Sequence, residues 1–344
     1  MFSGTKIENF KIGLRYSNFN RNLFSLDHRE ELYWFFREQF RFGHREILLD
    51  YLEKTYDNLI VGFLQHGAMP TSNPGEWTIR RTPNSLRSYF PSFVWSATAA
   101  EQALKKGYSH VVAIGSPWLY LLELNGFLKP FSQAPVASNL IERDLLIVPH
   151  HGSGHYRYLE TYDQSVRNLR ESVSDREASV LLYYTEFCDP RIREIWEKFN
   201  FKVLSNGMAW GPENRTVWSY NGGRPQFLNN TLQTILKFDE VICMAPTTFS
   251  IYSTSLGRKT SIQISEANLR DYRVVNEGKG VDRLRKVDEM QMQNAINFLG
   301  DDAFIPEITE RKKQTAWSYL GIDSMKSKVE LESILPLREG MIPV

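Results

Sequence analysis

Short apolar runs alternate along most of the chain with longer segments in which apolar residues recur every three to four positions. The short runs are typical of buried strands and the longer segments of helices that cover them. Strands are expected at 58–64, 93–96, 110–114, 145–148, 179–184, 202–204, 240–244 and 260–264. This alternation predicts an α/β fold built from βα units around parallel sheets.

The helices predicted between these strands are amphipathic, and several carry a proline near the start or a glycine after the end. They are expected at 26–57, 97–106, 117–125, 158–176, 190–199, 227–237 and 248–255. A linker rich in proline and small polar residues is expected at 126–141. It separates a first Rossmann-like unit, 1–135, from a second, 142–280, and a charged, mostly helical tail follows at 281–344.

Composition narrows the function classes. The 344 residues are 42% apolar and 24% charged, which is ordinary for a globular protein with a core that needs no metal or disulfide. Because 41 basic residues face 40 acidic ones, the net charge of +1 argues against a dedicated nucleic-acid protein. The two cysteines, Cys188 and Cys243, match no zinc spacing and are expected to be buried free thiols in a reducing compartment.

The N-terminus lacks an apolar run of signal-peptide length, and no run is long enough for a membrane span. We therefore expect a cytoplasmic location, either free or peripheral at the inner face of the membrane. The basic and aromatic stretch 35–42 is the candidate for membrane contact, and an ordinary amphipathic core helix is the alternative.

Special residues cluster where the predicted strands end, which is where open parallel sheets bind ligands. His66 follows a buried strand and precedes Gly67. Since the pKa of histidine lies near neutrality, His66 is the candidate catalytic base. The alternative is a histidine that only bonds a neighbouring loop.

The densest polar cluster follows the strand at 145–148. It contains His150, His151, Gly152 and Ser153. Glycine-rich backbone and histidine suit contact with a nucleotide phosphate. A metal site, for which the spacing gives only a weak signal, and a purely structural loop are the alternatives.

Three later strand ends carry further candidates. Thr247 and Thr248 stand at the start of a predicted helix, where hydroxyls and backbone N–H groups can hold an anion or simply cap the helix. Glu186 could bind a ribose or sugar hydroxyl, or act as a helix N-terminal charge. Asn206, before Gly207, could reach a nucleobase or form an ordinary turn.

Several familiar motifs are missing from the sequence. It contains no phosphate-binding P-loop, no complete G-x-G-x-x-G, no Asp-x-Asp for a divalent ion and no G-x-S-x-G nucleophile elbow.

Three stretches, 65–67, 94–120 and 227–259, resemble the GT-B glycosyltransferases in their order and spacing, and more narrowly the bacterial polysialyltransferase-like enzymes of surface and capsular polysaccharide synthesis. The resemblance spans about residues 55–265. It implies two Rossmann-like domains facing each other across a cleft. The N-terminal domain would bind the acceptor and the C-terminal domain the nucleotide sugar, and the tail would pack back on the N-terminal domain.

The resemblance further implies a transferase that moves a sugar from a CMP- or UDP-linked donor to a glycan or lipid-linked acceptor. It would invert the anomeric centre without metal or other cofactor. His66 would be the catalytic base, and His150, His151, Gly152, Ser153 and the Thr247–Thr248 pair would contact the donor. The rival functions are a sugar-nucleotide 2-epimerase on the same fold, a non-catalytic nucleotide-sugar-binding subunit and another α/β transferase.

Overall fold

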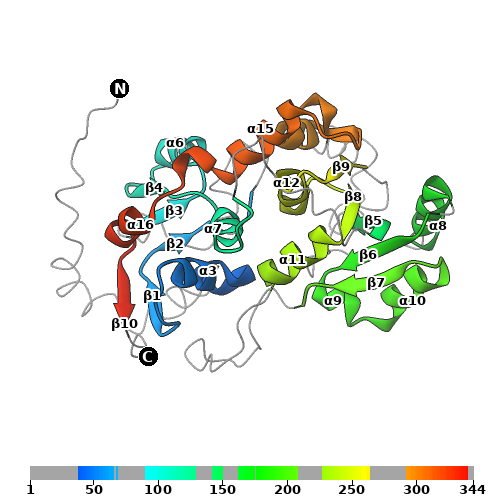
Figure 1. Ribbon diagram of the computed structural model, residues 1–344, viewed down its shortest axis with the longest axis horizontal. Coiled ribbons are helices and arrows are strands. Elements are labelled where there is room, and N and C mark those ends of the chain that lie inside the picture. The colour runs from blue at the N-terminus through cyan, green and yellow to red at the C-terminus, as the bar shows by residue number, and fades with distance from the viewer. Residues whose placement is uncertain are drawn as a thin grey trace, which may run out of the picture.

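A computed structural model describes residues 38–65, 67–68, 90–128, 142–149, 162–174, 176–207, 227–263 and 292–339. Its strands form a three-stranded parallel sheet in the order β2-β3-β4, a five-stranded parallel sheet in the order β7-β6-β5-β8-β9, and an antiparallel pair, β1-β10 (Figure 1). The predicted α/β class with parallel sheets is confirmed. The division into two domains facing across a cleft, with its boundaries, stays a prediction.

The strands are β1 (Asn58–Ile60), β2 (Phe63–Leu64), β3 (Ser92–Val94), β4 (Val111–Ala113), β5 (Glu142–Val148), β6 (Ala178–Leu182), β7 (Lys202–Ser205), β8 (Phe238–Cys243), β9 (Lys259–Ile262) and β10 (Leu337–Glu339). The α-helices are α3 (His44–Tyr51), α6 (Ala97–Lys105), α7 (Pro117–Leu124), α8 (Tyr162–Val173), α9 (Tyr184–Phe187), α10 (Pro190–Lys198), α11 (Phe227–Leu236), α12 (Thr248–Ser255), α15 (Glu310–Leu320) and α16 (Lys328–Ile334). The 3-10 helices are η3 (Glu38–Gly43), η7 (Asp301–Phe304) and η8 (Ile322–Ser324), and a further helix covers residues 292–299.

The five-stranded sheet is apolar on both faces because helices cover both. Along β5, Leu145 and Ile147 pack with the apolar cluster that includes α8 and α10, whereas Leu146 and Val148 pack with the cluster that includes α11 and α12. Successive side chains of a strand point to opposite faces, so this continuous apolar run is what a doubly covered parallel strand requires.

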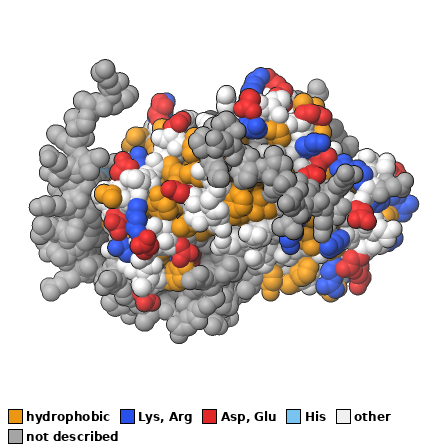
Figure 2. Space-filling view, in the orientation of Figure 1, with side chains coloured by type: hydrophobic (Ala, Val, Ile, Leu, Met, Phe, Trp, Pro, Cys, Tyr) orange, Lys and Arg blue, Asp and Glu red, His pale blue; other side chains and the backbone are white. Residues whose placement is uncertain are grey.

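One apolar cluster runs through both parallel sheets. It contains Leu64 and Phe93 from the three-stranded sheet and Leu146 and Val241 from the five-stranded sheet. On the face shown in Figure 2, apolar side chains gather over the middle of the molecule, with charged side chains mainly around them. The two sheets are therefore joined by shared core as well as by chain connections.

Two predicted elements are interrupted in the structure. The strand expected at 58–64 divides into β1, which pairs with β10, and β2, which pairs with β3. Gly62 lies between them, where a Cβ would be 2.5 Å from the Phe93 ring and 2.8 Å from the Pro91 carbonyl oxygen, so only glycine fits there. Within the described residues 38–57, the helix expected at 26–57 is confirmed only for α3; η3 is a separate 3-10 helix, and 52–57 is not helical. Phe42 and Gly43 have φ of 59° and 78°, which ends the right-handed path between them.

The C-terminal segment connects both sheets. Helix α15 packs on α12, where the buried Lys312 Nζ donates to the carbonyl oxygens of Thr260 and Ile305. The chain then reaches the N-terminal elements: Ser116 N donates to Leu320 O at 2.8 Å, and β10 pairs with β1. Figure 1 shows this path from α15 through α16 to β10.

Gly321, which ends α15, is the tightest point of this segment. Its φ is +75°, and a Cβ placed there would lie 1.8 Å from the Trp95 carbonyl oxygen. We expect Gly321→Ala to lower the free energy of unfolding by about 3 kcal/mol, because it combines a left-handed backbone with a clash against another backbone. Urea unfolding measures this difference.

Gly126→Ala is the matched control. Gly126 has φ of +72°, and no atom of the described residues lies within 4 Å of an added Cβ, so only backbone strain, about 1 kcal/mol, is expected. Equal losses in the two variants would contradict the close packing of Gly321 on Trp95.

Candidate functional site

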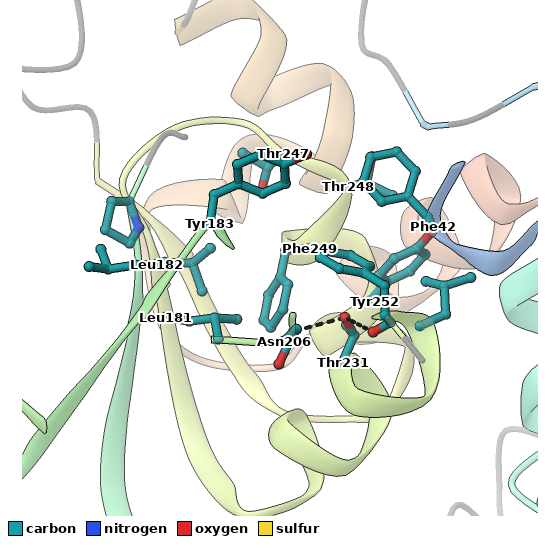
Figure 3. Close-up of a pocket in the computed structure, with 14 residues that line it drawn as sticks. Phe42, Leu181, Leu182, Tyr183, Asn206, Thr231, Thr247, Thr248, Phe249 and Tyr252 are labelled. Carbon is teal, nitrogen blue, oxygen red and sulfur yellow. Dashed lines mark hydrogen bonds between the residues drawn. The ribbon is translucent and has the colours of Figure 1, made fainter. Parts of the chain in front are cut away.

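A cavity of about 130 Å³ lies at the carboxyl end of the five-stranded sheet (Figure 3). Its walls come from the ends of β5, β6 and β7, from the starts of α11 and α12, and from the end of η3. The lining residues are Phe42, Val148, Pro149, Leu181, Leu182, Tyr183, Asn206, Phe227, Leu228, Thr231, Thr247, Thr248, Phe249 and Tyr252. Aromatic and aliphatic side chains dominate, three threonines add hydroxyl groups, and none of these described residues carries a formal charge.

Helix α12 begins in this pocket. Thr247 is its N-cap residue, with an extended backbone, and Thr247, Thr248 and Phe249 all line the cavity. The first N–H groups of a helix lack intrahelical acceptors, and the helix dipole adds partial positive charge there. The predicted placement of the threonine pair at a helix start is confirmed, and it gives an otherwise apolar pocket one end suited to an anion.

The loop after β2 reaches the same place. Thr248 Oγ1 donates to Ala68 O at 3.2 Å, and a Cβ on Gly67 would lie 3.3 Å from that hydroxyl. The loop is held on its other side by Gln65, whose Oε1 accepts from Trp95 N at 2.9 Å and whose Nε2 donates to Gly67 O at 2.9 Å. Gly67 and Ala68 therefore lie beside the start of α12, and Gln65, on the other side of position 66, is held by Trp95.

Several of the candidate residues lie outside the described part of the chain. These are His66, His150, His151, Gly152 and Ser153. Val148 and Pro149, which directly precede the histidines, line the pocket. Their roles stay predictions, as does the metal alternative for the 150–155 cluster; within the described ranges no group of three or more metal-ligating side chains occurs.

Asn206 lines the pocket, but its side chain is bonded to α11. Its Nδ2 donates to Thr231 Oγ1 and its Oδ1 accepts from Thr234 Oγ1, each at 2.8 Å; the first bond is drawn in Figure 3. Asn230 Nδ2 also donates to Asn206 O at 3.0 Å. Asn206 therefore ties the end of β7 to α11, and its contact with a nucleobase stays a prediction.

Glu186 is buried and is not among the residues that line the cavity. One carboxylate oxygen accepts from Tyr183 N at 3.3 Å, which caps the short helix α9. The helix-terminal role is the one that this geometry shows. Through it Glu186 supports the backbone of Tyr183, which does line the pocket.

Sequence reasoning missed the aromatic part of the pocket. Phe42, Tyr183, Phe227 and Phe249 lie at or next to element ends, Tyr252 lies inside α12, and none of them belongs to a motif. The aromatic share of 13% was compatible with ring-stacking pockets, but it suits a large core equally well. Only the tertiary structure shows which five of the aromatic residues line the pocket.

The pocket wall is anchored to the N-terminal elements through α12. Trp118 of α7 stacks on Tyr252 at 4.2 Å between ring centroids, with 16° between the planes, and its Nε1 donates to Ser255 Oγ at 3.0 Å. Trp118 is 0% exposed and Tyr252 5%. Helix α12 is therefore held in place by Trp118, more than 100 positions earlier in the sequence.

The sequence matches no protein-family model and no curated protein. Among solved structures it is similar to the UDP complex of MnaA from S. aureus, with 12% identity, coverage of 75% of this chain and 67% of that one, and a TM-score of 0.37. It is also similar to a putative UDP-N-acetylglucosamine 2-epimerase from Listeria monocytogenes, with 14% identity, coverage of 78% and 66%, and a TM-score of 0.36.

These similarities concern the fold alone, and this chain spans about two thirds of each of those chains. The narrower resemblance to polysialyltransferase-like enzymes is not supported by them. Within the described ranges, no helix has the length and apolar character needed to cross a bilayer.

The two cysteines differ in a way that the sequence did not predict. Cys243, at the end of β8, is buried as expected, and burial raises the pKa of its thiol to about 12. The expectation that Cys188 is buried is wrong: it follows α9 at the surface, because the apolar residues beside it pack without it.

We expect Ellman's reagent at pH 8 to titrate one thiol per native chain and two after denaturation, since Cys243 is both enclosed and protonated. Cys188→Ser should leave no reactive thiol in the native protein. Rapid labelling of two thiols in the native wild type would contradict the burial of Cys243.

Proposed function

We propose that this protein is an enzyme that binds a nucleotide sugar in the strand-end pocket and acts on its sugar. The observation that carries the proposal is that helix α12 begins inside an aromatic-lined cavity at the carboxyl ends of parallel strands. Aromatic rings suit a planar base, and a helix N-terminus suits a phosphate. Open α/β sheets bind ligands at this edge.

The described residues that line the pocket include no lysine, arginine or histidine, so the phosphate would be held by neutral groups. We assign its contacts to the backbone N–H groups at the start of α12 and to the hydroxyls of Thr247 and Thr248, with the Thr248 hydrogen turning from the Ala68 carbonyl oxygen to the phosphate on binding. His151 and Ser153 are proposed as further contacts, because the chain that leads to them passes along the pocket wall at Pro149. This arrangement needs no metal ion.

The first candidate reaction is glycosyl transfer. The acceptor oxygen would attack the anomeric carbon, the bond from that carbon to the phosphate oxygen would break, and His66 would take the acceptor proton. Groups at the start of α12 would stabilise the negative charge on the departing nucleotide. The fixed flanks of position 66, beside Thr248, support this role for His66.

The second candidate reaction is 2-epimerisation of the same ligand, which uses the same nucleotide pocket and differs only in the groups that reach the sugar. It requires an acid and a base to move the proton at C2. Glu186, the carboxylate that the sequence suggested for a ribose or sugar hydroxyl, is engaged in capping α9. Both reactions use the same described pocket, so an activity assay distinguishes glycosyl transfer from 2-epimerisation.

The binding proposal predicts that a nucleotide stabilises the native protein. In a thermal-shift panel of CMP, UDP, GDP and CDP, we expect one nucleotide to raise the melting temperature, with and without EDTA. Thr248→Val should weaken that nucleotide about fivefold, because the pocket loses a hydroxyl. Absence of a shift with every nucleotide would overturn the proposal.

Thr254→Val is the matched control on the same helix. Thr254 is fully buried, does not line the pocket, and its hydroxyl has no hydrogen-bond partner among the described residues. We expect this variant to keep both the nucleotide affinity and the stability of the wild type.

The catalytic proposal predicts that His66→Ala keeps the nucleotide shift and loses turnover at least 100-fold. Transfer would release free nucleotide only when an acceptor is added. Epimerisation would convert the donor, alone, to its C2 epimer, which NMR detects directly. Full activity of His66→Ala would remove His66 from the mechanism, and binding without either reaction would favour a non-catalytic subunit.

A further inference from the structure

Phe42 has an unusual backbone for a bulky residue. Its φ is +59°, and Gly43 follows with +78°, so two successive residues lie in the left-handed region. Glycine adopts this region freely, whereas a side chain with a Cβ is strained there. Strained residues of this kind concentrate at ligand sites, where the surrounding structure maintains them.

The strained residue points its ring into the strand-end pocket. Phe42 is half-buried, and its ring lies 5.1 Å from that of Phe227 at the start of α11, centroid to centroid. Among the described lining residues it alone precedes Val148 in the chain. Figure 3 shows Phe42 across the pocket from Leu182 and Tyr183.

The left-handed turn at Phe42 and Gly43 lies between two helices. It separates η3 from α3, so the chain changes direction at Phe42. A turn alone would be met at lower cost by glycine or asparagine. The Phe42 ring is held at this strained backbone, where it packs on Phe227 and the main apolar core and faces a cavity whose described walls carry no charge.

We propose that Phe42 stacks on the base of the bound nucleotide and closes the pocket from the N-terminal side. This inference rests on the proposed function. Phe42, Thr247 and Thr248 line the same cavity, so a base stacked on Phe42 and a phosphate at the start of α12 would occupy one pocket. The geometry makes Phe42 a binding residue, with no part in proton transfer.

The test uses the full chain and the nucleotide that stabilises it in the CMP, UDP, GDP and CDP panel. Isothermal titration should show that Phe42→Ala and Phe42→Gly raise its Kd about tenfold, the size of a base–aromatic stacking contribution. Phe42→Tyr, which keeps the ring, should bind as the wild type does. Asn200→Gly is the control: Asn200 also has a positive φ, 58°, is exposed and does not line the pocket, so its replacement should leave Kd unchanged.

Melting temperatures without nucleotide provide an independent readout. Both ring deletions remove the contact with Phe227, but only glycine relieves the left-handed backbone, so Phe42→Gly should melt above Phe42→Ala. Unchanged Kd values for both deletions, with binding by the wild type intact, would overturn this inference alone. A Phe42→Gly variant that melts below Phe42→Ala would overturn the strained conformation on which it stands. Failure of the wild type to bind any nucleotide would overturn both this inference and the proposed function.

Discussion

The contact between α7 and α12 is the interaction on which the rest of the structure depends. The stacked pair Trp118 and Tyr252, together with the Trp118–Ser255 hydrogen bond, is buried and joins elements far apart in sequence. Buried aromatic pairs add about 0.5–1.5 kcal/mol to the effect of area alone. Because Tyr252 also lines the pocket, the contact that joins the two sheets also sets the position of the pocket wall.

The C-terminal segment reinforces this junction from a second side. Gly321 packs against the Trp95 carbonyl, and Trp95 also holds Gln65 through its N and Nε1 atoms. The loop that leads to position 66 is therefore braced by a residue whose opposite side is covered by the tail. The contacts of Trp95 with Gly321 and Gln65 therefore serve both the stability of the fold and the position of the candidate site. The approach of Gly321 to the Trp95 carbonyl leaves no room for a side chain at residue 321.

Sequence patterns predicted the position of a strand or helix well where its burial was uniform along its length. The strands in the five-stranded sheet and α6, α10, α11 and α12 lie where periodicity and caps placed them, within a few residues. Predictions failed where strand pairing or a turn interrupted the apolar pattern. The strand expected at 58–64 divides because β1 pairs with β10 and β2 pairs with β3, and the left-handed turn at Phe42 divides an expected helix. Apolar periodicity indicates neither feature.

By itself the sequence determined the α/β class, the order of the elements and the polar residues at the strand ends, because burial periodicity and helix capping are local properties. Only the tertiary structure decided which strand ends share a pocket, that Phe42 joins Thr247 and Thr248 there, that Glu186 caps a helix, and that β10 pairs with β1. These contacts join residues tens to hundreds of positions apart. An apolar pattern predicts that a residue is buried, but it does not predict which residue it contacts.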